Sequence, residues 1–501
     1  MASSRARPKK SDPIEHELLE TVRNAVARAA ADVLDSAAVA AALIAEPLKR
    51  PARSAARVPN ENVALALSGG RDSMVLLDVL ARLAATRGTG IQRVTAVHVH
   101  HGLSPNADAW LAHCEAECAE RDVSLVVQRV QVKRRGQGIE AAAREARYAA
   151  LATAARAHRA RMVLTAHHRD DRLETFLLQW MRGAGPDGLA AFPPARVFGT
   201  GEGTELQLLR PLIDVGRSDI EHYVELRKVR YVDDDSNDDT ALTRNAIRHE
   251  VLPRIDALRP GFRIAAARSI DLVAEAAEAM RSIAAADLAA CEEGSPDGML
   301  RLDRLMTLPK SRQTGILRRW LGAAGVPPPS RARLLEALEQ ARNKRSDTRM
   351  LVRVGDCEVR RYRGLLMLKP VVDIDRDSLA LHWHGEEELS LPGWGGVLKF
   401  SVVNGEGFDP AWLRELPLEV RRRGGGERFK PHPSRPSKTL KRLFQDADIP
   451  EFERARLPLV WRKGELIFVG RLGADVRFTD RDGDRIAIEW EPDASLIERA
   501  T

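Results

Sequence analysis

The sequence predicts an α/β fold, in which a parallel sheet is covered by helices on both faces and is followed by two smaller domains. Short apolar runs alternate with helical stretches from Asn62 to about Met181, as expected of buried parallel strands joined by helices. A glycine-rich turn follows the first apolar run, where such folds bind ligands. The length of 501 residues also exceeds what one hydrophobic core usually organises.

Four apolar runs of five or six residues are predicted to be the strands of this sheet. They are residues 63–67, 94–99, 125–130 and 162–166. Each run is followed by a stretch predicted to be helical, at 73–83, 108–120, 140–158 and 171–181. Because the carboxyl ends of parallel strands meet at one edge of a sheet, the polar residues that follow these runs are expected to lie together.

The rest of the chain is predicted to form an extension and two further domains. In the extension, residues 1–13 are expected to be disordered, 15–48 helical and 51–59 a linker. A long helix at 262–290 follows the sheet, and strands punctuated by glycine and proline end the chain. The predicted parts are the extension 1–58, the sheet domain 59–250, a helical and α+β domain 251–372, and a small mixed C-terminal domain 373–501.

The bulk composition bounds the class of protein. Apolar residues make up 44% of the chain, but no uncharged apolar run is long enough to cross a bilayer. The N-terminus lacks the apolar region of a secretory signal, so a cytoplasmic protein with no membrane segment is expected. The four cysteines, none in a CxxC pair, are predicted to be buried thiols rather than disulfides or metal ligands; they are Cys114, Cys118, Cys291 and Cys357.

The first candidate site is the turn Ser68-Gly69-Gly70-Arg71-Asp72-Ser73, which follows a predicted strand and opens a helix. Two glycines let the backbone approach a ligand closely, and the N–H groups of the helix start favour an anion. The turn lacks the lysine of the GxxxxGK[ST] loop and does not fit GxGxxG. We expect it to bind the phosphates of ATP, and Asp72 beside phosphates implies Mg²⁺.

The second candidate site is the run 165–175, again where a strand enters a helix. Asp170 and Asp171 lie four and three residues before Glu174, so the three acids share one region of the helix surface. Acids in a first helical turn also complement the helix dipole, which is the alternative explanation. The adjacent His167 and His168 favour a functional site, because they offer acid–base or phosphate contacts.

Two other groups of residues carry less specific signals. His98, His100 and His101 end the second predicted strand, and one of them could simply be packed. The chain's net charge of +7 becomes concentrated near the C-terminus, in a run with three glycines and one aromatic that suits contacts with a phosphate backbone. The basic residues of that run are Arg421, Arg422, Arg423, Arg428, Lys430, Lys438, Lys441 and Arg442.

Taken in order, these motifs resemble those of the tRNA(Ile)-lysidine synthases, a family of PP-loop ATPases. The resemblance spans about residues 60 to 475. The matching segments are the PP-loop 68–73, HVxHGL at 98–103, ExxxRxxRY at 140–148, AHHxxDDxxET at 166–175, RGxGxxGL at 182–189, RPL at 210–212, DxSN…RNxxR at 235–248, and the basic region 421–443. The sequence departs from the family at His100, where Asn or Asp is usual, and at Arg172, where Gln is common.

The resemblance implies an adenine nucleotide α-hydrolase-like sheet and a two-step reaction on an isoleucine tRNA with a CAU anticodon. The C2 oxygen of the first anticodon cytidine attacks ATP, and L-lysine then displaces AMP. The resemblance also implies roles for domains 251–372 and 373–501 in binding substrate and tRNA, and homologues are often homodimers. The implied roles are pyrophosphate and Mg²⁺ binding by residues 68–73, metal or acid–base work by Asp171, lysine binding by Asp170 and Glu174, and phosphate contacts by His167, Arg147 and Arg244.

Two alternatives remain open at this stage. Another PP-loop enzyme that modifies a tRNA base, for example by adding sulfur, would need a reactive cysteine or an iron–sulfur site, and none of the four cysteines lies in such a motif. A tRNA-binding protein that has lost catalysis is the other alternative. The presence of Asp72, Asp170, Asp171 and Glu174 argues against it.

Overall fold

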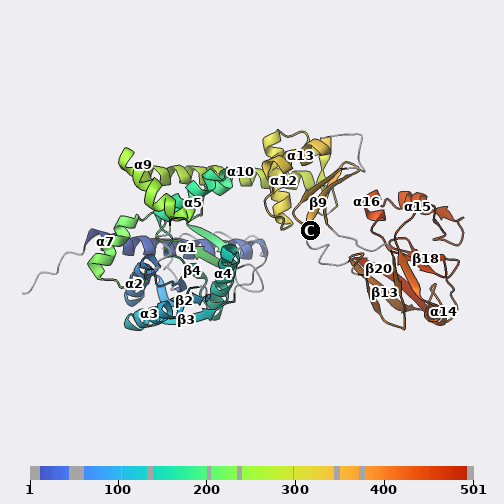
Figure 1. Cartoon of the computed structure of the whole chain (residues 1–501), viewed down its shortest axis with the longest axis horizontal. Coiled ribbons are helices and arrows are strands. Elements are labelled where there is room, and N and C mark those ends of the chain that lie inside the picture. The colour runs from blue at the N-terminus through green and yellow to red at the C-terminus, as the bar shows by residue number, and fades with distance from the viewer. Residues whose placement is uncertain are drawn as a thin grey trace, which may run out of the picture. The chain divides into compact units, whose positions relative to one another are not determined.

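The computed structural model describes most of the chain. The described residues are 12–44, 61–102, 104–131, 139–199, 205–233, 240–296, 298–342, 350–371, 378–391 and 393–492. They form two compact units, residues 1–277 and 278–501, which are considered separately (Figure 1). Among the described helices, none combines the length and apolar character needed to span a bilayer.

A six-stranded sheet forms the centre of the first unit, with the strand order β3-β2-β1-β4-β6-β5. Five strands are parallel, and only β5 pairs antiparallel, with β6. The strands are β1 (Glu61–Ala66), β2 (Ile91–His100), β3 (Ser124–Arg129), β4 (Met162–Leu164), β5 (Ala195–Phe198) and β6 (Leu206–Leu209). The predicted parallel sheet is therefore confirmed, and β5 and β6 extend it beyond the four predicted strands.

Helices cover both faces of this sheet, as predicted (Figure 1). One core layer joins the sheet to the helices before and after the PP-loop motif, and the opposite layer joins it to the helix that precedes β4. The helices of the unit are α1 (Pro13–Ile44), α2 (Arg71–Ala85), α3 (Ala107–Glu120), α4 (Ile139–Ala157), α5 (Arg169–Met181), α6 (Pro186–Leu189), α7 (Arg217–Arg227), α8 (Thr243–Ala246), the π-helix η2 (Ile247–Val251) and α9 (Leu252–Leu258); α10 (Phe262–Glu292) runs on into the second unit.

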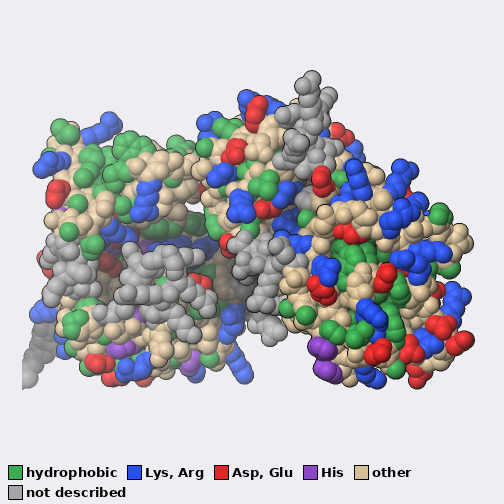
Figure 2. Space-filling model, turned by 45° about the vertical axis from the view of Figure 1, so that its right-hand side comes forward, with side chains coloured by type: hydrophobic (Ala, Val, Ile, Leu, Met, Phe, Trp, Pro, Cys, Tyr) green, Lys and Arg blue, Asp and Glu red, His purple; other side chains and the backbone are tan. Residues whose placement is uncertain are grey.

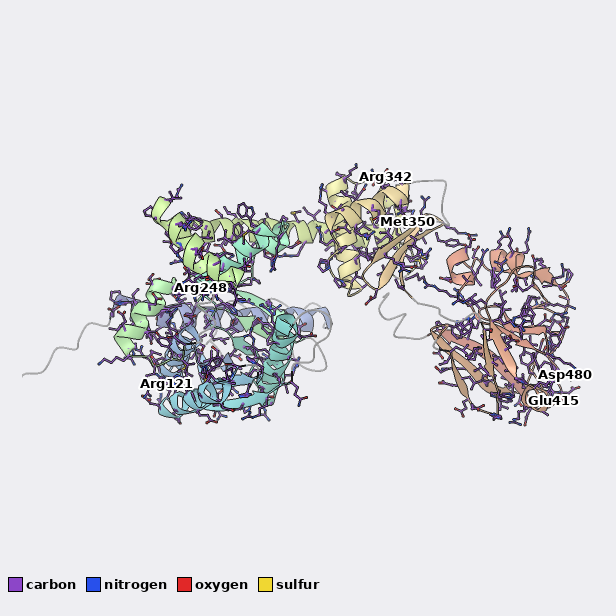
Figure 3. All side chains as sticks on the ribbon, viewed as in Figure 1. Arg121, Arg248, Arg342, Met350, Glu415 and Asp480 are labelled. Carbon is purple, nitrogen blue, oxygen red and sulfur yellow. The ribbon has the colours of Figure 1, made fainter. Side chains whose placement is uncertain are left out.

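A buried network of charges joins the helices on the first face. Asp78 of α2 accepts hydrogen bonds from the Tyr223 hydroxyl of α7 at 2.8 Å and from Arg121 Nε (Figure 3) at 3.1 Å. Glu117 of α3, only 1% exposed, pairs with Arg121 at 2.7 Å and with Arg230 at 2.6 Å. Since each carboxylate faces cations or donors, the network holds three helices together without leaving a buried charge unpaired.

Helix α1 packs into the core on the same face of the sheet, although it lies within the predicted N-terminal extension. Its side chains Leu18, Val22 and Val26 are at most 1% exposed and sit in the core cluster of α2 and β1. Glu15 ties it to α2 through Arg82, at 2.6 Å. The described part of the extension therefore buries apolar surface against the sheet domain.

The second unit contains two groups of antiparallel strands, each with its own core. The first is the sheet β7-β10-β9-β8 with α11, α12 and α13 packed on it; the second is formed by β11-β14-β17-β18-β19 and β12-β13-β20, with β15 pairing β16. Their elements are β7 (Leu300–Arg301), α11 (Leu302–Leu305), α12 (Lys310–Ala323), α13 (Arg331–Arg342), β8 (Leu351–Val354), β9 (Cys357–Tyr362), β10 (Leu365–Pro370), β11 (Ser378–Leu381), β12 (Glu388–Leu391), β13 (Gly396–Val403), α14 (Pro410–Glu415), β14 (Leu418–Arg421), β15 (Arg428–Phe429), β16 (Lys438–Thr439), α15 (Leu440–Asp446), α16 (Glu451–Arg454), β17 (Leu459–Arg462), β18 (Glu465–Val469), β19 (Gly473–Ala474) and β20 (Arg485–Pro492).

The packing of α1 predicts that a charge introduced at Val22 lowers the free energy of unfolding far more than a charge introduced at Asn24. Val22→Asp buries an unpaired carboxylate and should lower the free energy of unfolding by about 3 kcal/mol or more. Asn24→Asp, on the exposed side of α1, is the matched control and should change it by less than about 0.5 kcal/mol. Urea unfolding of both variants measures the difference, and equal midpoints would show that α1 is not part of the core.

Candidate active site

The PP-loop motif lies at the carboxyl end of β1, where it turns into α2. Gly69 has φ +89°, a left-handed conformation that favours glycine, and an added Cβ would lie 3.0 Å from Val232 and 3.2 Å from the Cys114 sulfur. Gly70 is the N-cap of α2 and provides no side-chain cap. The first N–H groups of the helix therefore remain available to an anion, as expected for phosphate binding.

Hydroxyl groups fix the conformation of this loop. The Ser73 hydroxyl donates to the Gly70 carbonyl at 2.8 Å and lies 3.1 Å from the Ser68 hydroxyl. The Ser68 hydroxyl in turn accepts the Gly70 N–H at 3.3 Å. The residues from Ser68 to Ser73 thus form one preformed turn, with its side chains held in place before any ligand binds.

Asp72 points from the first turn of α2 toward the acidic helix α5. Its Oδ2 lies 3.6 Å from His168 Nε2, and its Oδ1 lies 3.5 Å from Arg71 Nε. Burial alone would raise the pKa of Asp72, but His168 and Arg71 outweigh it and lower the pKa. Arg71 itself is directed away by an ion pair of 2.8 Å with Glu221 of α7.

His168 joins the two predicted sites, because both of its ring nitrogens face residues of those sites. The Asp170 N–H donates to Nδ1 at 3.2 Å, while Nε2 lies 3.6 Å from both Asp72 and Asp171. The neutral ring therefore carries its proton on Nε2, between the two carboxylates. Burial lowers the pKa of His168, but Asp171 and Asp72 overcome this effect and raise it.

The acids of α5 are buried, or in the case of Asp171 partly buried, and are neutralised by arginines from the helices that follow. Glu174 is 1% exposed, and its carboxylate lies 2.6 Å from Arg244 Nε and 2.6 Å from Arg248 Nε. Arg244 also reaches Asp171 at 3.1 Å. Arg248 is labelled in Figure 3. Because Arg244 and Arg248 lie one helical turn apart on α8 and η2, a single segment can face both acids.

Asp170 has a separate set of partners. It pairs with Arg263 of α10 and accepts the Arg217 backbone N–H at 2.9 Å. A cavity of about 200 Å³ lies beside it. The residues that line this cavity are Asp170, Glu174, Arg217, Arg248, His249 and Arg263.

His167 lies at the end of β4 and takes a different environment from its neighbour. Its Nδ1 is 2.9 Å from the Thr165 hydroxyl, and its ring packs 5.1 Å from that of Phe192. Burial lowers the pKa of His167 to about 4, and positive charge from Arg210, Arg244 and Arg147 adds to this effect, although Asp171 opposes it. The imidazole is therefore neutral at pH 7, and Arg147 lies close enough to influence it.

The histidines that end β2 do not join this cluster through their described contacts. His98 is buried, with Nδ1 3.0 Å from the Leu67 carbonyl and 3.6 Å from the Cys114 sulfur, so it is a packed residue that links β2 to β1. His100 lies 3.0 Å from Asp108. The predicted segment 235–237 and Leu103 lie outside the described residues, as does the side chain of Glu140.

The basic run near the C-terminus lies on the second unit, where Lys and Arg side chains are frequent on the surface (Figure 2, right). Several of its cations already have partners. Arg421 pairs with Glu419 and stacks 5.3 Å from the Trp461 ring, and Lys438 lies 2.7 Å from Asp446. The remaining members are Arg422, Arg423, Arg428, Lys430, Lys441 and Arg442, of which Arg428, Lys441 and Arg442 are exposed. Sequence reasoning missed the neighbouring acids, because they come from flanking elements.

The residues that sequence reasoning missed in the first unit are Arg217, Arg248, His249 and Arg263. Each lies 43 or more positions after Glu174 in the sequence, so no local spacing connects it to the acidic helix. Arg248 belongs to the recognised RNxxR motif, which is the one signal that pointed to this segment.

Family models match three regions of the chain: a PP-loop domain at residues 41–255, a TilS substrate binding domain at 300–367 and a TilS substrate C-terminal domain at 418–490. A tRNA(Ile)-lysidine synthase of Ralstonia nicotianae is 40% identical over 443 residues, covering 86% of this chain and 92% of the relative. The chain belongs to the tRNA(Ile)-lysidine synthase family. A second synthase, from Nitrosomonas europaea, is 35% identical and covers 87% and 93% of the two chains.

Solved structures add little to this family assignment. A U34-tRNA thiolase of Methanococcus maripaludis covers 52% of this chain and 80% of its own, with 14% identity and a TM-score of 0.39. The lysidine synthase relatives, not this distant likeness, establish the family. Their match includes the C-terminal domains, which the PP-loop alone would not specify.

The thiols of this lysidine synthase family member are expected to be inert, which also argues against sulfur transfer. All four cysteines are buried, and burial raises the pKa of Cys114 to about 12 and that of Cys118 to about 11. Iodoacetamide at pH 8 should therefore modify fewer than one thiol per native chain in an hour, and four after unfolding in guanidinium. Mass spectrometry counts the adducts, and rapid native labelling of Cys114 would contradict the structure.

The environment of His167 predicts a pH dependence of stability. Its pKa is about 4 in the folded chain and near 6.5 when unfolded, so the unfolded state binds more protons between these values. The free energy of unfolding should therefore fall as the pH is lowered from 6.5 toward 4, and His167→Asn should make this fall shallower. Urea unfolding of the wild-type protein and of the variant at pH 7 and pH 5 measures this fall. The same loss of unfolding free energy in both proteins would contradict the buried neutral ring.

Proposed function

We propose that this chain joins L-lysine to C2 of the first anticodon cytidine in an isoleucine tRNA, using ATP and giving lysidine, AMP and pyrophosphate. The observation that carries this proposal is the family match, which extends from the PP-loop domain to the C-terminal domain. The reaction takes place where ATP and tRNA are found, and we propose a cytoplasmic location.

The first step activates the base. The C2 oxygen of cytidine attacks the α-phosphorus of ATP, the bond to the bridging oxygen breaks and pyrophosphate leaves. We assign the pyrophosphate to Ser68–Ser73, where the N-terminus of α2 offers unpaired N–H groups. Arg147, Arg244 and the neutral His167 lie on the neighbouring elements and would contact the phosphates. The RNA base must leave its stack for this attack to occur.

The second step forms the carbon–nitrogen bond. The side-chain amine of lysine attacks C2, the C2–oxygen bond breaks with departure of AMP, and the amine loses a proton to restore neutrality. We assign the lysine ammonium to the cavity beside Asp170 and Glu174. Both carboxylates already face arginines, so the substrate would share them rather than meet bare anions.

The donor set also fits a Mg²⁺ ion. Asp72 and Asp171 place one carboxylate oxygen each at 3.6 Å from the same His168 nitrogen, so the two acids converge. Mg²⁺ is commonly held by one or two carboxylates together with substrate phosphates. When bound, the ion would offset the negative charge of the triphosphate. Asp171 suits this role better than proton transfer: burial alone would raise its pKa, but His168 and Arg244 outweigh this and lower the pKa, so the carboxylate is a weak base.

A labelling assay tests the function directly. The full chain is incubated with ATP, Mg²⁺, radiolabelled lysine and the CAU tRNA, and a tRNA with uridine at the first anticodon position is the control. Label should enter only the cytidine-containing RNA. Binding of that RNA without label would favour the catalytically silent alternative.

The loop carboxylate should be essential for this reaction. Asp72→Asn keeps the size of the side chain but removes its charge, so lysine incorporation should fall by about 100-fold or more. Asp122→Asn is the matched control, because Asp122 is exposed and its left-handed conformation tolerates Asn. Equal activity of the two variants would exclude Asp72 from the chemistry.

A further inference from the structure

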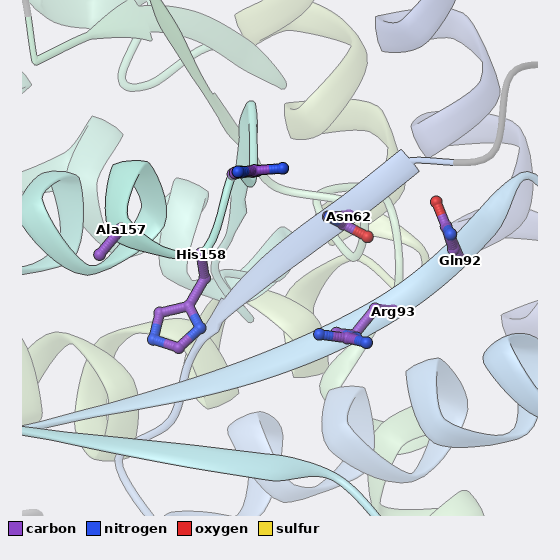
Figure 4. A pocket seen from close by; sticks show the side chains of 6 residues that line it. Asn62, Gln92, Arg93, Ala157 and His158 are labelled. Carbon is purple, nitrogen blue, oxygen red and sulfur yellow. The ribbon is translucent and has the colours of Figure 1, made fainter.

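A second pocket lies where β1 and β2 begin, and Figure 4 shows the side chains that line it. Its volume is about 320 Å³, and it is lined by Asn62, Gln92, Arg93, Ala157, His158 and Arg159. These residues come from the start of β1, the start of β2 and the turn between α4 and β4. The catalytic loops follow the other ends of the same strands, so about 20 Å of β1 separates the two sites.

The lining of this pocket is suited to an anion. It contains two guanidinium groups, an imidazole and two side-chain amides, and no acidic residue. Within the described part of the chain, neither Arg93 nor Arg159 has a side-chain hydrogen bond or ion pair, although most arginines of this unit do. The nearest described acid on these strands, Glu61, interacts with Arg161 instead.

Two local departures from regular backbone geometry direct the arginines into this pocket. The pairing of β1 with β2 slips by one residue, from Glu61↔Ile91 to Asn62↔Arg93, so Gln92 is bulged. Gln92 and Arg93 are consequently both exposed, where a regular strand would alternate. Arg159 follows α4 and has φ +54°, a conformation for which glycine is usual after a helix. The charge at the end of α4 could explain a cation at Arg159, but it does not explain Arg93 on another element.

We propose that this pocket binds phosphate groups of the tRNA backbone, as a contact remote from the reacting base. The inference rests on the proposed function, which supplies the RNA. Planar guanidinium groups match phosphate geometry, and exposed backbone phosphates need no deep cavity. Because Arg93 and Arg159 stand on separate elements, neighbouring phosphates of one polyanion can contact both guanidinium groups.

The test compares two double variants with equal loss of charge. Arg93→Gln with Arg159→Gly empties the pocket of guanidinium groups, and the glycine suits the backbone at that position. Arg23→Gln with Arg28→Gln removes two charges from α1 and is the control. Dissociation constants for the CAU tRNA are measured by fluorescence anisotropy over a range of salt concentrations, together with melting temperatures and lysine incorporation at saturating tRNA.

The pocket variant should bind tRNA roughly 10- to 30-fold more weakly at 0.15 M salt, because two contacts that release counterions are lost. The slope of log K against log salt should fall by about 1.4 to 1.8, while the control keeps the wild-type slope. The melting temperature and the incorporation rate at saturating tRNA should stay unchanged. An unchanged slope would overturn the proposal. An unchanged slope together with a lower melting temperature would show that the two arginines stabilise the fold instead.

A free anion is the other possible source of phosphate. Inorganic phosphate and pyrophosphate are therefore titrated against both variants at constant ionic strength. If these anions bind the wild-type pocket, but tRNA binding is the same in both variants, the pocket holds a small anion. The RNA contact is then excluded. Failure of the proposed function would look different, since wild-type protein would then incorporate no lysine, whatever the variants show.

Discussion

The buried carboxylates at the start of α5 have to be neutralised, and the rest of the active-site region provides the groups that do so. Asp170 and Glu174 leave water almost completely and Asp171 does so in large part, and isolated buried charges of this kind would be prohibitively unstable. Their compensation comes from His168 and from arginines on α8, η2 and α10. The helices after the sheet domain are thus held against it by charge neutralisation as well as by apolar packing.

The same constraint explains why one fold can serve two chemical steps. The PP-loop leaves backbone N–H groups at the start of α2 without a side-chain cap, while α5 carries carboxylates, and His168 lies between them. Opposite electrostatic demands are met by placing helix N-termini and acids on adjacent strand ends, where a parallel sheet brings them together. The proposed reaction, in which a triphosphate and an amine bind side by side, needs this separation of charge.

The sequence allowed the central sheet and the two charged motifs to be predicted, because both depend on local patterns. The apolar run of β1 is uninterrupted, those of β2 and β4 are mostly apolar, and each motif closely follows a strand. Strands β5 and β6 were missed, since they have four residues each and no helix between them. The partners of Asp170 could not be foreseen, because Arg263 is 93 residues away and only the folded chain brings them into contact. The burial of α1 was likewise invisible in a stretch rich in alanine and arginine.

The close packing around Gly69 has a consequence for nucleotide affinity. Val232 and Cys114 hold the turn from behind, and the Val232 N–H donates to the Gly69 carbonyl at 3.0 Å. A loop fixed in this way loses little conformational entropy when a nucleotide arrives, so more of the interaction free energy remains as affinity. The fixed loop also selects one ligand shape, because its N–H groups are already held in position. A ligand of another shape has to change its own conformation in order to bind.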